Sequence, residues 1–428
     1  MYSYREKLKK YTTYAIILMP ILGTYGFLSK SITIADLMIM ISLFGIFFYF
    51  LINHKVKLSS NSFLIFSIWV FISTILASVL GNDLFSSITI LQLIKFFVYS
   101  LLILAVPTEF FDRKKAEEIY TRIAIVLSII VFIQLAIYLI TGTFKPWVIN
   151  NSYFPPIFVN DDYFSSGYLY MLGGNSFRPS SIFTEPALFA QYVSPCLILN
   201  MFKENSKKKY IILITITAAT ILGKSANGII YVAIIWLFYL YFMLVKKIKS
   251  KNRKINIGFV LMILGMSLIL PLSFTKIKDF LVGDNQYSIK QRIGEIFDES
   301  GETSGSMRVV RGWKIFNALT MSEKTIGIGN GNIINYLNSH YGIVTMFKES
   351  YNGYMSGLSA IFVNFGIIGG ILYLSWWITE FKKKNPILKS LLMFLLLYLI
   401  ASNSFLTPQF IVTTILIISM GKVKNKKI

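Results

Sequence analysis

Apolar residues form long, unbroken blocks along this chain instead of recurring at the helix or strand spacing of a soluble domain. Residues 34–52 (IADLMIMISLFGIFFYFLI) are the clearest block, and Asp36 near its edge is the only charge. A hydrocarbon core about 30 Å thick needs about 20 apolar helical residues to cross it. The pattern therefore predicts membrane-spanning helices, and similar blocks recur through the sequence.

The blocks predict an all-α integral membrane protein with about twelve transmembrane helices in a single polytopic domain, residues 1–428. The expected helices lie at 12–28, 33–52, 62–80, 88–106, 121–140, 183–202, 210–222, 229–245, 257–273, 357–379, 388–402 and 408–421. Because the block at 210–222 is short, residues 210–245 form either two spans or a re-entrant pair. The first block lacks a small-x-small cleavage pattern, so we interpret it as a helix and not as a signal peptide.

Basic residues are distributed unevenly between successive connections of these helices. The chain is 55% hydrophobic and carries a net charge of +22. Clusters of Lys and Arg lie at both ends and in alternate connections, for example 113–115 and 246–254, whereas the short opposite connections hold only Lys30 and Lys224. Cytoplasmic connections are enriched in Lys and Arg, so both termini are predicted to be cytoplasmic. The basic charge thus indicates membrane orientation and argues against nucleic-acid binding.

Two long connections on the predicted outer side, residues 141–182 and 274–356, interrupt the series of short ones. Both are rich in Tyr, Phe, Asn, Gly and Ser. Aromatic faces stack on sugar rings and amides bond hydroxyl groups, although the same residues also fill ordinary membrane-interface loops. Long loops in compact proteins are usually functional. We therefore expect the activity to reside mainly on the outer face.

The second long connection contains a stretch with helical spacing, MRVVRGWKIFNAL (307–319). It predicts a helix that rests on the membrane surface or caps a cavity between spans. Its expected apolar stripe is Val310, Trp313, Phe316 and Leu319, and Arg308, Arg311 and Lys314 are expected on the other faces. The following GIGNGN (327–332) is either a turn or a backbone segment that approaches a ligand closely. It lacks the Lys-Ser/Thr of a phosphate-binding P-loop.

Two ionisable residues stand out near the apolar blocks. Lys95 lies about a third of the way into the span 88–106, where it is either functional or a lysine whose long side chain reaches the surface. Glu185 precedes Pro186 at the start of the span 183–202. A carboxylate there is favoured by the helix dipole, so its alternative role is that of a helix-start anion.

The chain offers few ligands for a metal or a disulfide framework. Cys196 is its only cysteine, and His54 and His340 are its only histidines. No D-x-D pair of carboxylates occurs, although that spacing commonly holds a metal in nucleotide-sugar transferases. We therefore expect neither a metal site nor a cofactor.

Four stretches together resemble the Wzy-type O-antigen and capsular polysaccharide polymerases of the O-antigen ligase–polymerase superfamily. FRPSSIFTEPALFAQY (177–192) resembles their R-x-S-x-x-F-x-E-P segment, and SGSMRVVRGWKIF…TIGIGNGN (304–332) resembles their Arg-bearing outer loop. NGYMSGLSAIFVNFGIIGG (352–370) and LGKSANGIIYVAI (222–234) are similar to two further stretches. Two positions depart from the pattern. Tyr351 replaces the histidine that ligases often carry before Asn, and Ala226 replaces the arginine of S-R-x-G.

The resemblance implies a GT-C-like glycosyltransferase of the bacterial plasma (inner) membrane. In this mechanism a hydroxyl of one lipid-linked repeat unit attacks the anomeric carbon of a polyprenyl-pyrophosphate-linked glycan, and the lipid pyrophosphate leaves. Fixed cations stabilise the charge on the departing phosphates, and arginine suits this best. The implied partners are an undecaprenyl-pyrophosphate-linked oligosaccharide, the lipid bilayer and a candidate chain-length regulator protein. The product is O-antigen, as in lipopolysaccharide, or capsule.

The motif positions nominate residues for each role in this reaction. For the pyrophosphate they are Arg178, Arg308, Arg311 and Lys95; for the base or acceptor-hydroxyl contact they are Glu185 and His340. The alternative role of each arginine is anchoring to lipid phosphates at the interface. Arg292 is a further cation of the second loop. The rival functions are an O-antigen ligase, which uses the same donor, and a flippase or other transporter of lipid-linked oligosaccharide.

Overall fold

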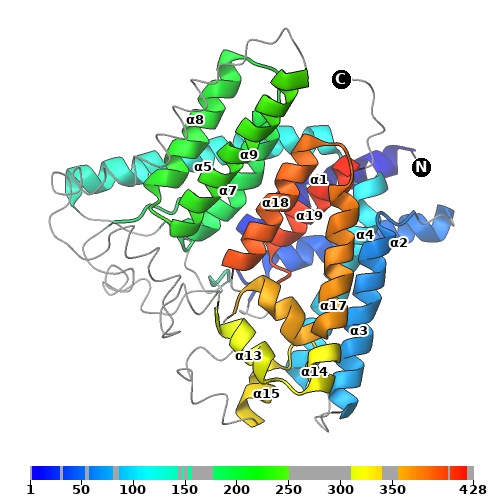
Figure 1. Ribbon diagram of the computed structural model, residues 1–428. Coiled ribbons are helices and arrows are strands. Elements are labelled where there is room, and N and C mark those ends of the chain that lie inside the picture. Colours follow the sequence, from blue (N-terminus) through cyan, green and yellow to red (C-terminus); the bar gives the residue numbers. More distant parts are fainter. Residues whose placement is uncertain are drawn as a thin grey trace. The chain divides into compact units, whose positions relative to one another are not determined.

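The structure is a computed structural model that describes residues 2–28, 32–53, 57–80, 86–142, 147–148, 153–156, 177–249, 310–339, 355–402 and 405–421. Within these residues it is all-helical, with no strand and only two isolated β-bridges, which join Tyr25 to Pro156 and Gly26 to Thr33 (Figure 1). The all-α prediction is therefore confirmed for the described chain. The expected helix at 257–273 lies outside it.

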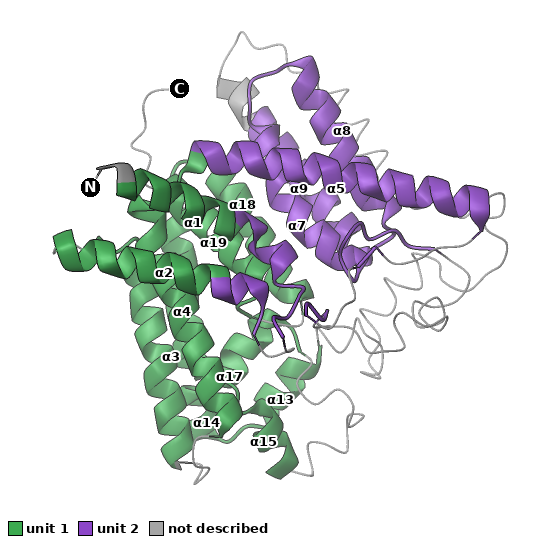
Figure 2. Ribbon diagram, turned by 180° about the vertical axis from the view of Figure 1, so that it is seen from behind, with its two compact units in different colours: residues 1–16, 38–113, 293–428 green, residues 17–37, 114–292 purple. Residues whose placement is uncertain are grey.

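The chain divides into two compact units, coloured separately in Figure 2. Unit 1 comprises residues 1–16, 38–113 and 293–428, and unit 2 comprises residues 17–37 and 114–292. Unit 1 holds most of α1 (Tyr2–Leu22) and α2 (Ile34–Asn53), then α3 (Asn61–Leu80), α4 (Ser87–Glu109), α13 (Gly312–Ala318), α14 (Met321–Ile326), α15 (Ile333–Ser339), α17 (Gly357–Phe381), α18 (Pro386–Ala401) and α19 (Pro408–Gly421). Unit 2 holds α5 (Arg113–Thr141), α7 (Pro186–Met201), α8 (Lys207–Leu222) and α9 (Ala226–Lys249).

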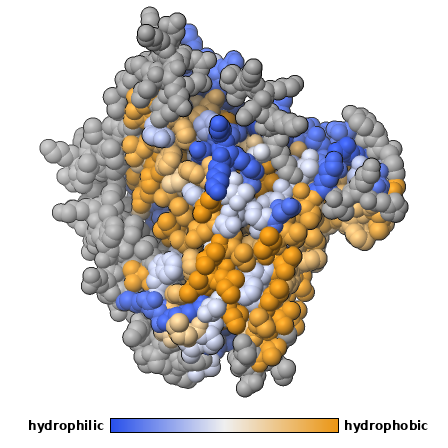
Figure 3. All heavy atoms as spheres, turned by 45° about the vertical axis from the view of Figure 1, so that its right-hand side comes forward, coloured by the Kyte–Doolittle hydropathy of each residue, from blue (hydrophilic) through white to orange (hydrophobic). Residues whose placement is uncertain are grey.

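Six helices in the described residues are long and apolar enough to cross a membrane: α2, α3, α4, α5, α9 and α17. Large apolar side chains are exposed on them, such as Ile41 and Phe44 on α2 and Val79 on α3. Figure 3 shows apolar side chains covering much of the surface of one face. A soluble monomer rarely exposes apolar patches of this extent, whereas lipid covers them in a bilayer. The described helices are thus those of a multi-pass membrane protein.

Several predicted helices differ from the structure at their ends, as the first helix and the one expected at 183–202 show. The first helix spans Tyr2–Leu22 and not 12–28, because the charged N-terminal residues continue it and Gly23 follows its end. Beyond it, Tyr25 and Gly26 pair with other segments as bridges. The helix expected to begin at residue 183 begins at Pro186, since proline fits the first helical turn.

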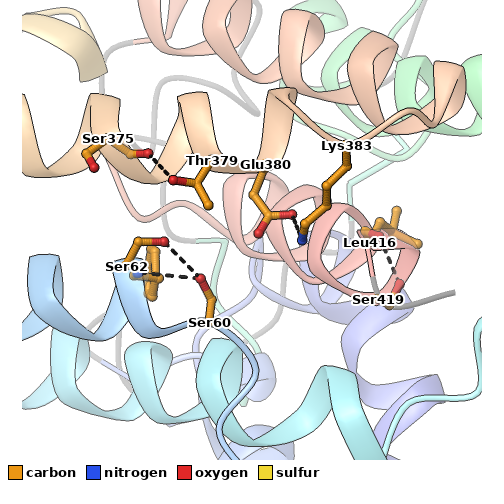
Figure 4. A network of polar contacts seen from close by, with 9 residues as sticks. Ser60, Ser62, Ser375, Thr379, Glu380, Lys383, Leu416 and Ser419 are labelled. Atoms are coloured by element: carbon orange, nitrogen blue, oxygen red, sulfur yellow. Dashed lines mark hydrogen bonds and ion pairs between the residues drawn. The ribbon is translucent and has the colours of Figure 1, made fainter. Parts of the chain in front are cut away.

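Unit 1 is organised around α17, which packs on α3, α14 and α18. Its interior is rich in aromatic rings, such as Phe66, which contacts both Phe365 and Tyr373 edge-on. At the C-terminal end of α17, the buried Glu380 carboxylate forms an ion pair with Lys383 Nζ at 2.6 Å. This pair lies near the start of α3 and the end of α19 (Figure 4). A buried carboxylate is tolerated because this ammonium pairs with it.

Candidate functional site

The residues of the FRPSSIFTEP stretch form a short non-helical segment, residues 177–185, which we call the Arg178 segment. It leads into the N-terminus of α7 in unit 2. Ser181 takes a left-handed backbone conformation with φ of 59°, which is uncommon for a residue with a side chain. Ser180 Oγ donates to the carbonyl oxygen of Phe183 at 2.7 Å and stabilises the turn. Arg178 itself is half-buried.

The LGKSANG stretch meets the Arg178 segment within unit 2. Gly223 ends α8, and a Cβ atom placed on it would lie 3.3 Å from the carbonyl oxygen of Pro179 and 3.5 Å from Pro186. Gly228, in the first turn of α9, lies closer still to α7, since a Cβ atom placed on it would be 2.9 Å from the Cβ of Ala190. Small residues thus let the α8–α9 turn pack directly on the Arg178 segment. Two stretches that carry the family resemblance, about 40 residues apart in sequence, therefore lie side by side.

Glu185 occupies the N-cap position of α7 and its side chain is exposed. Its backbone oxygen accepts the N–H groups of Leu188 and Phe189, as expected for the residue that starts a helix. Among the described residues, its carboxylate makes no capping hydrogen bond with α7. The helix dipole favours a negative charge here, but the carboxylate oxygens are not used to close the helix end.

In unit 1 the glycine-rich loop, residues 327–332, packs against the backbone of α17. A Cβ atom on Gly327 would clash with the carbonyl group of Asn364, and one on Gly366 would clash with that of Thr325. Gly327 and Gly366 both have positive φ values, 92° and 68°. The close approach that these glycines permit is therefore to the protein's own chain, which favours the structural interpretation of GIGNGN over a ligand-binding one.

The glycine-rich loop also forms hydrogen bonds at a break in α17. At Gly366 the backbone leaves the helical conformation, with φ 68° and ψ −173°. The carbonyl oxygens freed there accept hydrogen bonds from the backbone N–H groups of Ile328, to Val363 at 3.0 Å, and Gly329, to Asn364 at 2.9 Å. The N–H groups of the loop and the carbonyl groups at the break are thus hydrogen-bonded to each other, as buried backbone groups require.

The loop also contacts the ends of α3 and α4. The backbone N–H of Asn330 donates to Thr74 Oγ1 at 3.0 Å, and its side-chain amide donates to the carbonyl oxygen of Gln92 at 3.2 Å. Thr89 donates to the amide oxygen of Asn332. Lys95, half-buried on α4, lies one helical turn beyond Gln92, so unit 1 brings it near this loop.

The helix expected over 307–319 exists as the shorter α13, Gly312–Ala318, and its buried face was predicted only in part. Gly312, Ile315 and Leu319 are buried, and Trp313 and Phe316 pack partly exposed against Phe362. The absence of a side chain on Gly312 lets α13 approach Ser359 of α17 closely. A helix that rests on another helix buries the residues that face it, and in α13 these include its glycine.

Arg311, expected on a polar face, is instead only 1% exposed in unit 1, just ahead of α13. Burial lowers the pKa of its guanidinium from the usual value. Arginine nevertheless keeps its charge in proteins, so Arg311 is a fixed cation inside unit 1. Lys314 is exposed as expected.

The nominated residues fall into two groups. Arg178 and Glu185 lie on one short segment of unit 2, and Arg311 and Lys95 belong to unit 1. Arg308, His340 and Arg292 lie outside the described residues.

Two residues that the sequence reasoning missed prove central to these contacts. Gln134 bonds the backbone of Ser181, and Trp69 bonds the carbonyl oxygen of Phe365 at 2.9 Å. Gln134 is the only amide in the apolar stretch IVFIQLAIYLI, and a lone polar residue at that depth of a span is a signal for an internal partner. Trp69 has no comparable signal, because its ring is mostly apolar and fits the apolar pattern of the span.

Comparison with known proteins does not assign the chain to a family. No family model matches it, and no curated protein matches it.

Proposed function

We propose that this protein is a glycosyltransferase that joins polyprenyl-pyrophosphate-linked oligosaccharide repeat units into a polysaccharide, O-antigen or capsule. One observation carries the proposal: the Arg178 segment packs on the α8–α9 turn and ends in an exposed carboxylate that does not cap its helix. A cation and a carboxylate on one constrained segment are the two groups that glycosyl transfer from a pyrophosphate needs.

In this proposal each residue has one role. Arg178 stabilises the negative charge that builds on the departing pyrophosphate, and Arg308, Arg311 and Lys95 are the further cations that the family resemblance nominates for this role. Glu185 accepts the proton of the attacking hydroxyl, and His340 is the alternative acceptor. The buried Arg311 suits the part of a fixed charge, since burial strengthens its field and keeps it from reorienting.

We further propose about twelve spans with both termini in the cytoplasm of a bacterium and the site on the outer face, in a GT-C-like arrangement. Contacts near helix ends agree with the predicted alternation of the spans, because each joins two ends predicted to lie on the same side of the membrane. The backbone N–H of Gly26 donates to Pro155 and that of Gly357 donates to Ser402, and each pair joins ends predicted to be outside. The backbone N–H of Ser59 donates to Leu104, which joins two ends predicted to be inside.

Reporter fusions test the topology directly. Fusions after Asn160 and Ser300 should be active only outside, and fusions after Ser250 and Lys384 only inside, because basic connections stay in the cytoplasm. A cytoplasmic signal from the fusion at Ser300 contradicts the outer-face site.

Deletion of the gene followed by analysis of the surface glycan tests the function. A polymerase mutant should lose the polymer but retain single repeat units attached to their carrier. Complete loss of attached glycan would indicate a ligase, which transfers the same donor to another acceptor, or a flippase.

The second candidate, a transporter of lipid-linked oligosaccharide, is favoured by the break in α17. Transporters often carry such interrupted helices, whose free carbonyl groups line the path of the substrate. In this chain the carbonyl groups of Val363, Asn364 and Phe365 are bonded by the protein itself. The break therefore serves the packing of the glycine-rich loop, and polymerisation remains the better-supported function.

A further inference from the structure

The amide of Gln134 holds the Arg178 segment by two hydrogen bonds to a single residue. Gln134 lies in α5 and is fully buried. Its Nε2 donates to the carbonyl oxygen of Ser181 at 2.7 Å, and the backbone N–H of Ser181 donates to Gln134 Oε1 at 2.9 Å. Both bonds require the same orientation of the amide, so its assignment is unambiguous. The side chain pairs with Ser181 as a neighbouring strand would.

The residue that Gln134 holds is the one with the unusual backbone. Ser181 has a φ of 59° and is 1% exposed. A non-glycine residue in this region persists only where its surroundings determine it, and here the buried amide does so. Without it, the buried N–H and C=O of Ser181 would lose these partners, which disfavours this conformation.

Ser181 lies in the chain between the two candidate site residues of unit 2. Arg178 lies three residues before it and Glu185 four residues after it. A change in the backbone at Ser181 therefore changes the direction of the chain between the cation and the carboxylate. We propose that Gln134 is a positioning residue, which sets the placement of Arg178 relative to Glu185 by holding Ser181 in the left-handed conformation. This inference rests on the proposed function, and Gln134 itself touches no substrate.

The first test removes the amide and keeps its volume. Gln134→Met, assayed as purified full-length protein with polyprenyl-pyrophosphate-linked repeat units, should lower kcat/KM about tenfold to a hundredfold, since small misplacements of catalytic groups have effects of this order. Adding Ser181→Gly should recover part of the loss, because glycine adopts the left-handed conformation without the help of the amide. A purely structural role of Gln134 in the packing of α5 predicts no such rescue.

The matched control is Val131→Ala. Val131 is also buried on α5, three residues before Gln134, but contributes only apolar packing. Its loss should leave kcat/KM within about threefold of the wild type, since it changes no hydrogen bond of Ser181. An equal loss of activity in Val131→Ala and Gln134→Met overturns the positioning role.

A second readout does not depend on the reaction. Hydrogen exchange of the purified protein should show faster exchange in peptides covering 177–185 for Gln134→Met, with peptides of α7 unchanged, and no acceleration for Val131→Ala. If Gln134→Met does not accumulate, Gln134→Glu serves in both assays. Its carboxylate has no donor for Ser181 at neutral pH, whereas its protonated form does, so activity and protection should rise as the pH falls.

The two proposals fail in different ways. If the wild-type protein has no polymerase activity but the exchange pattern is as expected, the proposed function is rejected. The hydrogen bonding of Gln134 to Ser181 is then still supported. Active wild-type protein together with unchanged activity and exchange in Gln134→Met overturns the inference alone.

Discussion

The indole N–H of Trp69 donates a hydrogen bond to the carbonyl oxygen of Phe365, 2.9 Å away and 296 residues distant in sequence. That carbonyl group is free because α17 breaks at the next residue, Gly366. The glycine-rich loop donates two further hydrogen bonds, from residues 328 and 329, so the loop and α3 together pair the carbonyl oxygens at the break. The break is thus the point at which α3, the glycine-rich loop and α17 are hydrogen-bonded to one another.

Trp69→Phe should therefore destabilise unit 1 by about 1–3 kcal/mol, the cost of leaving a buried carbonyl group unpaired. The apparent melting temperature of the purified protein in detergent measures this. Trp147→Phe, at an exposed tryptophan of unit 2, is the control and should have little effect. Equal melting temperatures for Trp69→Phe and wild type would show that the bond contributes nothing.

Gly327→Ala should be far more harmful than Gly142→Ala. Both glycines have positive φ, 92° and 64°, so both substitutions carry a conformational cost of about 1 kcal/mol. At Gly327 the added methyl also clashes with the backbone of Asn364, whereas no described atom lies within 4 Å of the position at Gly142. We expect a total loss of about 2–4 kcal/mol at Gly327. The test is to measure the membrane accumulation and the melting temperature of both variants. Similar values for the two would contradict the packing of the loop on α17.

Arg178→Ala should abolish polymer while the protein still accumulates in the membrane. Arg178→Lys should rescue poorly, because an ammonium group cannot reproduce the two parallel hydrogen bonds of a guanidinium to a phosphate. Arg308→Ala should behave in the same way. Arg122→Ala, at an exposed arginine of α5, is the matched control and should make normal polymer. Near-normal polymer from both Arg178→Ala and Arg308→Ala would reject the pyrophosphate role.

Glu185→Gln should cut polymerisation by about a hundredfold to ten-thousandfold, the usual contribution of a positioned base. The amide keeps the shape of the side chain, and α7 should remain intact because the carboxylate does not cap it. His340→Ala should have a smaller effect. Assay of both variants on the same lipid-linked substrate compares them; an inactive His340→Ala beside an active Glu185→Gln reverses the assignment and favours a ligase.

The sequence by itself determined that the long apolar segments of the described chain are helices and that they suit a membrane. Helix formation in an apolar block depends on local properties, namely its length and the lack of charges, so blocks such as 34–52 predicted α2 to within one residue. It also located Glu185 at the start of α7, since Pro186 marks a first turn. Even the second long connection was correctly expected to contain a helix.

Only the tertiary structure decided which polar and small residues meet. Arg311 and Lys314 have the same charge and lie three residues apart, yet Arg311, just ahead of α13, is buried and Lys314, within α13, is exposed. Gln134 finds Ser181 across 47 residues, and the glycines of the loop find the backbone of α17. A hydrogen bond or a close backbone approach depends on where distant segments come to lie, and no local pattern of residues encodes that position.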